Sequence, residues 1–414
     1  MSEWKEFQLG ELYIVSSGLS KAADQFGFGN TFISFKDVFN NYFLPENPEG
    51  LVNSNEKEQT SCSVKAGDIL LTRTSETNDE VGMSSVALKD YEKSTFNGFC
   101  KRLRIKKDAP IKVSSLYIGY LLRTRFFRKT VANFATMTTR ASLNSESIKS
   151  IPLLFPSFSL QEEIGKTLHC LDKKINLLKQ QNQTLEELAQ TLFKRWFVEF
   201  EFPNGNGKPY KSFGGEMVES ELGEIPEGWK VGHLEDEFTI LMGQSPSGSS
   251  FNESKVGKVF YQGRTDFGFR FPTNRLYTIE PKRIAYKFDV LVSVRAPVGD
   301  VNMASEECCI GRGLGAVKSD LKSYCFNKIK SLKKAFDVFE KEGTVFGSLS
   351  KNDFNGLEVI VPKKQVAEEY DKSTLGLDLK IFENEQQIQT LTQLRDTLLP
   401  KLMNGELQVN EEKL

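Results

Sequence analysis

The sequence predicts a tandem repeat of the α/β (α+β) class, in which a domain of mixed strands and helices is followed by a long helix, twice over. Three observations support this prediction. A chain of 414 residues is too long for one ordinary hydrophobic core. A shift of 206 residues places Ser142 on Ser348 and Pro156 on Pro362, without gaps between them. Along this matched stretch both copies space their apolar residues as packed helices do.

The match continues into the two helical stretches. The aligned pairs are Glu162-Glu163 on Glu368-Glu369, Leu171-Asp172 on Leu377-Asp378, Gln180-Gln181 on Gln386-Gln387, and Thr191-Leu192 on Thr397-Leu398. A chain built twice from the same kind of piece tends to present two related surfaces, which suits a bipartite target.

Residues 1–157 form the first predicted domain and residues 224–362 the second, because the same order of elements occurs in both. The first has strands at 67–73 and 101–105, a helix at 115–132 and a closing strand at 151–156. The second answers with strands at 288–295 and 315–318, a helix at 323–341 and a closing strand at 357–362. Both closing strands end in proline.

A long helix is predicted after each domain, at 158–202 and at 363–405. Ser159 and Glu162 have the spacing of a capping box at the start of the first helix. The second helix should end or kink at Pro400, since proline cannot continue the helical hydrogen bonds. A linker rich in turn formers, 203–223, separates the two halves, and a tail occupies 406–414.

The apolar positions of both helices follow steps of three and four residues, which predicts a seam between paired helices. The seam residues are Leu171, Ile175, Leu178, Asn182, Leu185 and Leu192 in the first helix, and Leu377, Ile381, Ile388, Leu391 and Leu398 in the second. Polar residues interrupt it at Asn182, and at Asn384 and Arg395. A buried asparagine lowers stability but can specify register and partner. The alternative is two amphipathic helices that lie separately on their own domains.

Composition argues for an ordinary globular protein, with 39% apolar and 26% charged residues and a net charge of −1. No run of eighteen apolar residues occurs that could span a membrane, and no signal peptide is visible at the start of the sequence. The six cysteines lack the spacing of metal ligands or of a small disulfide-linked domain. We therefore expect a cytoplasmic protein with reduced thiols.

Catalytic motifs are missing from the sequence. It has neither a phosphate-binding loop that ends in Lys-Ser or Lys-Thr nor a Gly-x-Gly-x-x-Gly segment after a strand. The two histidines, His169 and His233, cannot form a zinc site with the scattered cysteines. We expect a non-enzymatic protein without a metal or cofactor of its own.

Arginines beside small residues near predicted turns are the candidate functional groups. Arginine can bind guanine edges or phosphates with two hydrogen bonds, and small neighbours allow backbone amides to approach. The candidate DNA-contacting residues are Arg73, Thr74, Ser75, Arg140 (in Thr138-Thr139-Arg140-Ala141-Ser142), Arg264, Arg295 and Arg312. Each arginine could equally belong to a surface ion pair.

Several phrases, taken in order, resemble the DNA-specificity subunit of type I restriction–modification systems. They are Glu224-Ile225-Pro226-Glu227-Gly228-Trp229, Gly67-Asp68-Ile69-Leu70, Ala141-Ser142-Leu143-Asn144, Leu192-Phe193-Lys194-Arg195-Trp196-Phe197, and Leu398-Leu399-Pro400-Lys401-Leu402-Met403-Asn404-Gly405-Glu406-Leu407. The resemblance covers essentially the whole chain, and its strength lies in the ordered, duplicated set.

The resemblance implies two target-recognition domains that each read half of a split double-stranded DNA target, with the two long helices paired antiparallel between them. It implies no activity in this subunit. The partners would be methyltransferase subunits, which use S-adenosylmethionine to modify adenine, and a translocating restriction subunit that needs ATP and magnesium. The recognition domains vary within the family, so the resemblance does not say which residues touch bases.

The length of the seam agrees with this hypothesis. Leu171 and Trp196 are 25 residues apart, or roughly 38 Å of helix, which is close to one turn of B-DNA at roughly 34–36 Å. The helix pair would then set the distance between half-sites. The alternative function is a coiled-coil adaptor whose globular domains bind proteins, which would show neither sequence preference nor a steep salt dependence of DNA binding.

Overall fold

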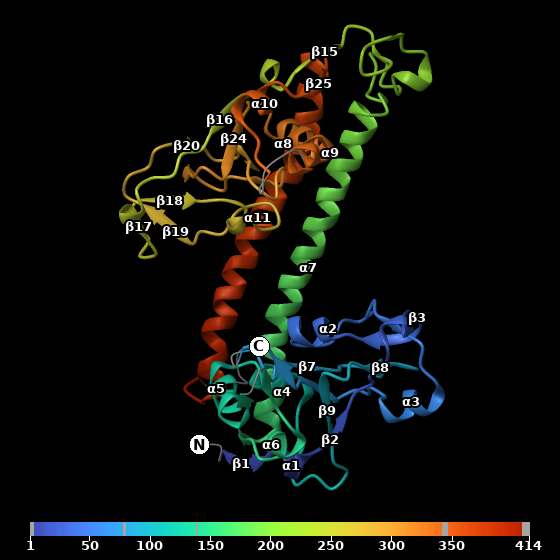
Figure 1. The fold of residues 1–414 in the computed structure, drawn as a ribbon, viewed down its shortest axis with the longest axis vertical. Coiled ribbons are helices and arrows are strands. Elements are labelled where there is room, and N and C mark those ends of the chain that lie inside the picture. The colour runs from blue at the N-terminus through green and yellow to red at the C-terminus, as the bar shows by residue number, and fades with distance from the viewer. Residues whose placement is uncertain (1–3, 78–79, 138–139, 342–346, 408–414) are drawn as a thin grey trace. The chain divides into compact units, whose positions relative to one another are not determined.

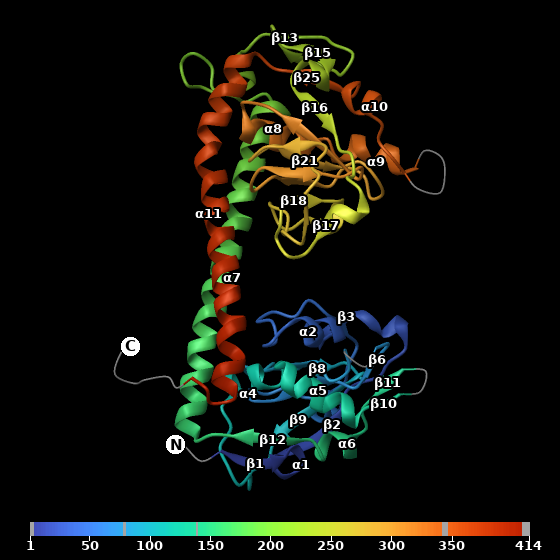
Figure 2. The same ribbon diagram turned by 90° about the vertical axis from the view of Figure 1, so that its left-hand side faces the viewer.

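The computed structural model describes residues 4–77, 80–137, 140–341 and 347–407. Thr138, Thr139 and most of the expected tail, 408–414, therefore lie outside the described residues. The chain forms two compact units, one of residues 1–175 and 390–414 and the other of residues 176–389 (Figures 1 and 2). Among the described helices, none is both long and apolar enough to cross a lipid bilayer.

The first unit contains the strands β1 (Lys5–Gln8), β2 (Tyr13–Ser17), β3 (Phe26–Ile33), β4 (Leu51–Val52), β5 (Ile69–Thr72), β6 (Thr74–Ser75), β7 (Ser84–Val86), β8 (Thr95–Phe96), β9 (Cys100–Ile105), β10 (Thr136–Met137), β11 (Ala141–Ser142) and β12 (Pro152–Phe155). Its shorter helices are α1 (Leu9–Leu12), α2 (Phe35–Asn40), α3 (Glu56–Ser61), α4 (Ser115–Leu121), α5 (Arg125–Phe134) and α6 (Ser145–Lys149).

The second unit contains the strands β13 (Met217–Val218), β14 (Ile225–Pro226), β15 (Lys230–His233), β16 (Thr239–Met242), β17 (Phe251–Asn252), β18 (Lys258–Tyr261), β19 (Leu276–Thr278), β20 (Ile284–Ala285), β21 (Val290–Ser293), β22 (Val301–Met303), β23 (Cys308–Ile310), β24 (Leu314–Lys318) and β25 (Glu358–Val361). Its shorter helices are α8 (Lys322–Ser331), α9 (Lys333–Lys341) and α10 (Lys351–Asn355).

The predicted duplication is present in the sheet topology. A four-stranded antiparallel sheet has the order β2-β9-β5-β7 in the first unit and β16-β24-β21-β22 in the second. A second sheet in each unit contains one parallel pair, β3 with β8 and β18 with β23. In each unit the opening strand also pairs antiparallel with the closing strand, β1 with β12 and β15 with β25. Each unit therefore repeats one arrangement of strands.

The long helices α7 (Phe158–Phe197) and α11 (Lys364–Met403) each contain 40 residues. They run antiparallel within the second unit, because Asn384 donates a hydrogen bond to Asn182 (2.9 Å) and Tyr370 donates one to the carbonyl of Ala189 (2.8 Å). α7 ends before the expected residue 202, as the chain turns away and Phe200 adopts a left-handed backbone with φ +60°.

Two predictions about the helix ends are wrong. The cap of α7 is Ser157 rather than Ser159, because α7 begins at Phe158 and the Ser157 Oγ accepts a hydrogen bond from the amide of Leu160 (3.4 Å). α11 does not end at Pro400 but continues to Met403, so the expected end there is wrong, while the alternative of a kink at Pro400 stays a prediction. The buried side chains of the last turn, Leu402 and Met403, pack into the hydrophobic core of the first unit and stabilise it.

The helix predicted at 115–132 is two helices, α4 and α5. Thr124 separates them, since its hydroxyl accepts a hydrogen bond from the amide of Phe127 (3.2 Å) and caps α5. The helix predicted at 323–341 is likewise divided, at Leu332, into α8 and α9. Local hydrogen bonds at helix ends override the long apolar pattern that predicted single helices.

The helix seam contains a buried polar pair. Asn182 and Asn384 are 1% and 0% exposed and bond to each other, and Asn182 also donates to the carboxylate of Glu385 (2.7 Å). Of the predicted apolar seam residues, four are buried, namely Ile175, Leu178, Ile381 and Ile388, while Leu171, Leu185, Leu192, Leu377, Leu391 and Leu398 are half-buried. Two of the three predicted polar interruptions, Asn182 and Asn384, therefore bond to each other across the seam.

Replacement of Asn182 by alanine is expected to destabilise the second unit by about 1–3 kcal/mol, because the buried amide of Asn384 then lacks its acceptor. The midpoint of chemical denaturation, followed by circular dichroism, measures this loss. Gln183→Ala is the control, since Gln183 is an exposed neighbour whose side chain bonds to Glu187 on its own helix. An equal effect of the two variants would contradict a specific role for the asparagine pair.

Candidate nucleic-acid interface

Each unit builds the same hydrogen-bonded edge where the central strand of its four-stranded sheet ends. In the first unit Arg73, after β5, donates its amide to the carbonyl of Phe99 (2.9 Å) and accepts from the amide of Leu143 (2.8 Å). In the second unit Val294, after β21, bonds in the same way with Gly313 (3.0 Å) and Leu349 (2.9 Å). The edge is therefore a duplicated backbone frame.

This alignment pairs Thr74 with Arg295, the residues that follow Arg73 and Val294. Thr74 pairs with Ser142 in the β6–β11 ladder, and Arg295 forms an isolated bridge with Ser348. The two copies thus present different side chains from one backbone position.

The structure brings three predicted arginines to this edge of the second unit. Arg264 follows β18, Arg295 follows β21, and Arg312 lies in the loop between β23 and β24. The loops are tied together because the amide of Gly311 bonds to the carbonyl of Tyr261 (2.8 Å) and the carbonyl of Gly313 bonds to the amide of Val294 (3.0 Å).

These arginines differ in their surroundings. Arg295 and Arg312 are exposed, and the amide of Arg312 is held by the Oγ of Ser245 (3.2 Å). Arg264 pairs with Asp300 and lines an open cavity of about 420 Å³ together with Lys330 and Lys333. Sequence patterns did not reveal these lysines or Ser245, because only the fold brings them to the loops.

In the first unit the predicted residues Thr74, Ser75 and Arg140 line one open cavity of about 620 Å³. Lys36 and Asn40 of α2 line the same cavity, and sequence analysis missed both because they are distant in the chain. Arg140 is exposed and lies 3.9 Å from a carboxylate oxygen of Glu76, which is also exposed. Donors and acceptors of several types thus surround a concave surface that a base edge or a phosphate could enter.

Arg73 is less accessible than Arg140 and is not among the residues that line this cavity. It is half-buried, and its Nε is buried without a hydrogen-bond partner among the described residues. Its side chain lies near Lys101, whose pKa is lowered by burial and by the charge of Arg73. Arg73 is therefore better placed to support the edge than to contact DNA.

We expect Arg140→Ala to weaken DNA binding about tenfold or more without lowering the thermal unfolding midpoint, because the side chain is 64% exposed. Arg73→Ala is the matched variant and should lower the unfolding midpoint as well. Fluorescence anisotropy with target duplex and differential scanning fluorimetry separate the two effects. Full affinity in the Arg140 variant would exclude this residue from the interface.

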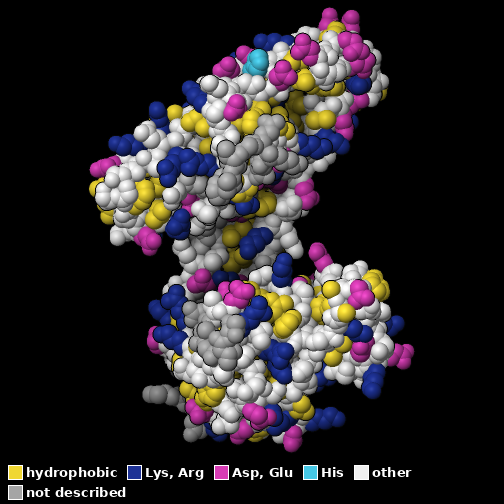
Figure 3. Space-filling model, viewed as in Figure 1, with side chains coloured by type: hydrophobic (Ala, Val, Ile, Leu, Met, Phe, Trp, Pro, Cys, Tyr) yellow, Lys and Arg dark blue, Asp and Glu magenta, His cyan; other side chains and the backbone are white. Residues whose placement is uncertain are grey.

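Charge is distributed over each unit in several separate groups. Figure 3 shows Lys and Arg side chains next to acidic and apolar ones on the visible face of both units. Such a mixed surface does not favour unselective binding of polyanions. It agrees with the net charge of −1. Selective contacts at the loop edges are better supported than a general basic patch.

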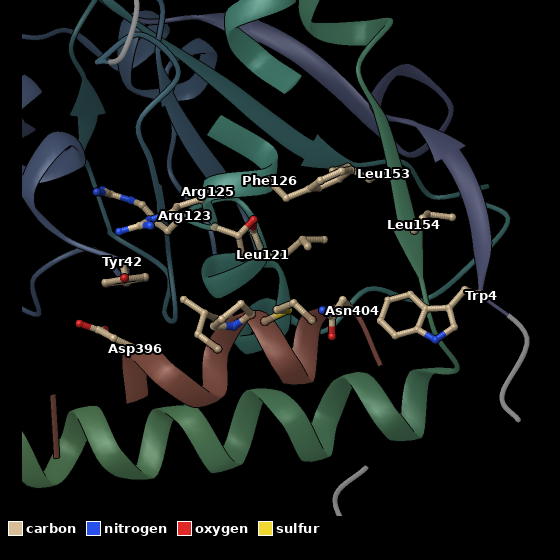
Figure 4. Close-up of a pocket in the computed structure, with 14 residues that line it drawn as sticks. Trp4, Tyr42, Leu121, Arg123, Arg125, Phe126, Leu153, Leu154, Asp396 and Asn404 are labelled. Atoms are coloured by element: carbon tan, nitrogen blue, oxygen red, sulfur yellow. The ribbon is translucent and has the colours of Figure 1, made fainter. Parts of the chain in front are cut away.

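The first unit also contains a large cavity of about 880 Å³ between the α4–α5 junction and the last turns of α11. Figure 4 shows Phe126, Leu153 and Leu154 on one side, Trp4 at one end, and Tyr42 close to Asp396 at the other. Arg123 lines it too, but its guanidinium is held by the carbonyls of four residues of the unit, namely Val38, Phe39, Asn41 and Ser84. Burial lowers the pKa of Arg123 to about 10. The mostly apolar lining does not suit a phosphate backbone.

Among the described residues, no group of three or more His, Cys, Asp or Glu side chains could hold a metal ion. His169 packs edge-on against the ring of Phe43 (centroids 5.2 Å apart), and burial lowers its pKa.

Comparison with known proteins identifies the class. The chain matches the family described as the type I restriction modification DNA specificity domain over residues 1–187 and 226–396. These ranges contain most of both halves, and the chain belongs to this family. It is therefore a type I restriction–modification specificity subunit, as the sequence motifs predicted, and the adaptor alternative is not favoured.

Relatives support this assignment along nearly the full length. A protein of Methanocaldococcus jannaschii assigned as the type I restriction enzyme MjaX specificity subunit is 30% identical over 352 residues, which cover 83% of this chain and 79% of that protein. The type I restriction enzyme HindI specificity subunit of Haemophilus influenzae is 27% identical and is matched over 98% of this chain and 100% of its own length.

A solved structure shows the same fold. The crystal structure of the type I restriction–modification S subunit from M. genitalium matches 97% of this chain and 96% of its own length, with a TM-score of 0.63 and 15% sequence identity.

Proposed function

We propose that this subunit reads a bipartite double-stranded DNA target, with one half-site contacted by the loop edge of each unit. The observation that supports the proposal is the duplicated edge, which has one backbone frame and different side chains. Thr74 of the first unit corresponds to Arg295 of the second, and Phe99 corresponds to Gly313. The same backbone arrangement with different side chains in the two units suits recognition of two different base sequences.

The proposed contacts divide into two sets. In the first unit they are Thr74, Ser75 and Arg140, with Lys36 and Asn40 at the same cavity. In the second unit they are Arg264, Arg295 and Arg312, with Ser245. Exposed arginines can bind guanine edges or phosphates, and hydroxyl and amide groups can bind either strand.

The subunit has no chemical activity of its own in this proposal. It assembles with methyltransferase subunits, which supply adenine methylation with S-adenosylmethionine, and with a restriction subunit that uses ATP and magnesium. The antiparallel helices α7 and α11 act as the spacer between the two readers. The buried seam and the asparagine pair, which lie in the second unit, support a specific pairing of the two helices there.

Co-expression of this chain with a cognate methyltransferase subunit tests the proposed function. Sequencing that detects modified adenines should show methylation at a split target with two defined half-sites. Binding of the purified complex to target duplex should fall steeply with salt and exceed binding to a scrambled duplex by about 1000-fold or more. Equal binding to both duplexes would contradict the proposal.

A further inference from the structure

The two long helices carry the same aspartate, Asp172 in α7 and Asp378 in α11, at the 206-residue repeat. In the first unit Asp172 accepts a hydrogen bond from the hydroxyl of Tyr120 in α4 (2.6 Å). It also pairs with Arg395 of α11 (2.7 Å), which bonds in addition to the exposed Asp396. The cation that neutralises Asp172 therefore comes from the other helix, and the globular domain supplies a neutral hydroxyl.

In the second unit the cation comes from the globular domain. Arg270, in the loop after Gly268, is 1% exposed, and it donates hydrogen bonds to Asp378 (2.9 Å) and, from its Nε, to Glu186 of α7 (2.9 Å). Its guanidinium stacks on the ring of Phe326, 3.8 Å from the centroid. Ser323 of α8 also bonds to Asp378.

Glu186 of α7 and Asp371 of α11 add two more carboxylates to this part of the helix pair. Lys330 of α8 forms a second ion pair with Glu186. Burial alone would raise the pKa of Glu186, but Arg270 and Lys330 hold it below its ordinary value. Asp371 accepts a hydrogen bond from the amide of Tyr324 (3.0 Å), and burial raises its pKa.

The repeat shows why the two units differ. Shifted by 206 residues, Glu186 falls on Thr392 and Ala189 falls on Arg395. The facing helix thus contributes a carboxylate beside Asp378 and an arginine beside Asp172. A buried charge without a partner is strongly destabilising, so the globular domains must compensate differently.

We propose that this difference is a positional key that decides which recognition domain the helix pair accepts in each unit. The second unit accepts a domain that supplies a buried cation to Glu186 and Asp378. The first accepts a domain that supplies a neutral hydroxyl to Asp172, because Arg395 already neutralises it. The proposal rests on the proposed function in one respect, namely that the two domains are separate readers of DNA.

The first test measures the stability of the complete chain. Arg270→Met should lower the folding equilibrium constant of the second unit about a hundredfold or more, since the buried Asp378 then lacks its cationic partner and Glu186 keeps Lys330 but loses Arg270. Arg270→Met lowers the denaturation midpoint. Adding Glu186→Gln and Asp378→Asn to Arg270→Met should recover at least half of this decrease. Arg270→Lys, which keeps the charge, should lie between the wild type and Arg270→Met.

Lys258→Met is the control, because Lys258 lies in the same unit and both partners of its ion pair with Glu307 are exposed, at 39% and 46%. Equal stability of the Arg270→Met and Lys258→Met chains would overturn the proposal. Failure of the neutralised triple variant to recover would also overturn it, since the loss would then reflect packing around Phe326 rather than charge.

The second test exchanges the domains. Two chimeric chains are compared, in both of which a copy of residues 4–155 replaces residues 229–361. One chimera keeps the helix pair unchanged, and the other carries Glu186→Thr and Ala189→Arg in α7. Only the altered helix pair should yield a soluble complex with the methyltransferase subunit. Equal results on both helix pairs, whether success or failure, would overturn the key.

The same experiment separates failure of the key from failure of the proposed function. If the proposed function holds, the altered chain should methylate a target in which both half-sites are those of the first domain. A soluble, assembled complex that leaves the half-sites unchanged would support the key and contradict the reading of one half-site by each domain.

Discussion

Deletion of seven residues from each long helix is expected to shorten the unread spacer of the DNA target by about three base pairs. Seven residues span roughly 10.5 Å of helix, and one turn of about ten base pairs spans roughly 34–36 Å. The two half-site sequences should remain the same, because the loop edges are untouched. Sequencing of modified adenines in cells that express the variant and a methyltransferase subunit measures both.

The segments to remove are 178–184 and 382–388, which face each other across the seam. Their deletion removes Asn182 and Asn384 together and leaves the pairs of Asp172 and Asp378 in place. A heptad also keeps the apolar face in phase. Deletion of 178–184 alone is the control and should prevent folding, because the seam of α11 loses its partner. New half-sites with an unchanged spacer would refute a spacing role for the helices.

Replacement of Arg264, Arg295 and Arg312 by glutamine is expected to abolish recognition of one half-site. Each arginine contact with a base edge contributes about 1–3 kcal/mol, so specific affinity should fall roughly a hundredfold or more. The slope of log affinity against log salt should decrease by up to about three. Binding measured at several salt concentrations, with duplexes mutated in one half-site at a time, checks both effects.

A matched control removes the same charge from the other ends of the strands. Lys255 precedes β18, Lys258 is the first residue of β18 and Lys287 precedes β21, whereas the three arginines follow the strand ends. Lys255→Gln, Lys258→Gln and Lys287→Gln together should leave specific binding nearly unchanged. If the control triple lost as much specific affinity as the arginine triple, net charge rather than the loop edge would explain the effect.

Patterns with a short sequence range could be predicted well. The helical seam depends on spacings of three and four residues, and the structure buries Ile175, Leu178 and Ile381 in it, with Asn182 beside them. The strands around residues 69–72 and 290–293 were also predicted, because uninterrupted apolar runs mark buried strands. Both the seam and these strands depend on residues that are close together in the sequence.

Features that depend on helix ends were predicted less well. The apolar pattern of 115–132 continues through Thr124, yet the hydroxyl of Thr124 caps a new helix. Ser159 has capping-box spacing, but the chain begins α7 at Phe158. In both places several residues could cap equally well by sequence, and tertiary packing selects one of them.

The candidate arginines could be found by sequence but not sorted. Arg73 and Arg295 both follow matched strands, yet the hydrogen bonds of the edge align Arg73 with Val294, so Arg73 is half-buried and Arg295 is exposed. Arg270 was missed altogether. Its neighbours in Phe269-Arg270-Phe271 are aromatic, which is the one local sign that this arginine could be buried.

The sequence by itself determined the duplicated order of elements, the length and seam of the two helices, and the family. The order of elements and the seam follow from repetition and periodicity, and the family follows from the resemblance of an ordered set of motifs; all of these are properties of a linear chain. Only the tertiary structure decided which residues share an edge and which charges are buried. Arg270 lies 84 residues from Glu186 and 108 residues from Asp378 along the chain. Their pairing depends on the free energy of burying opposite charges together, which no local sequence pattern records.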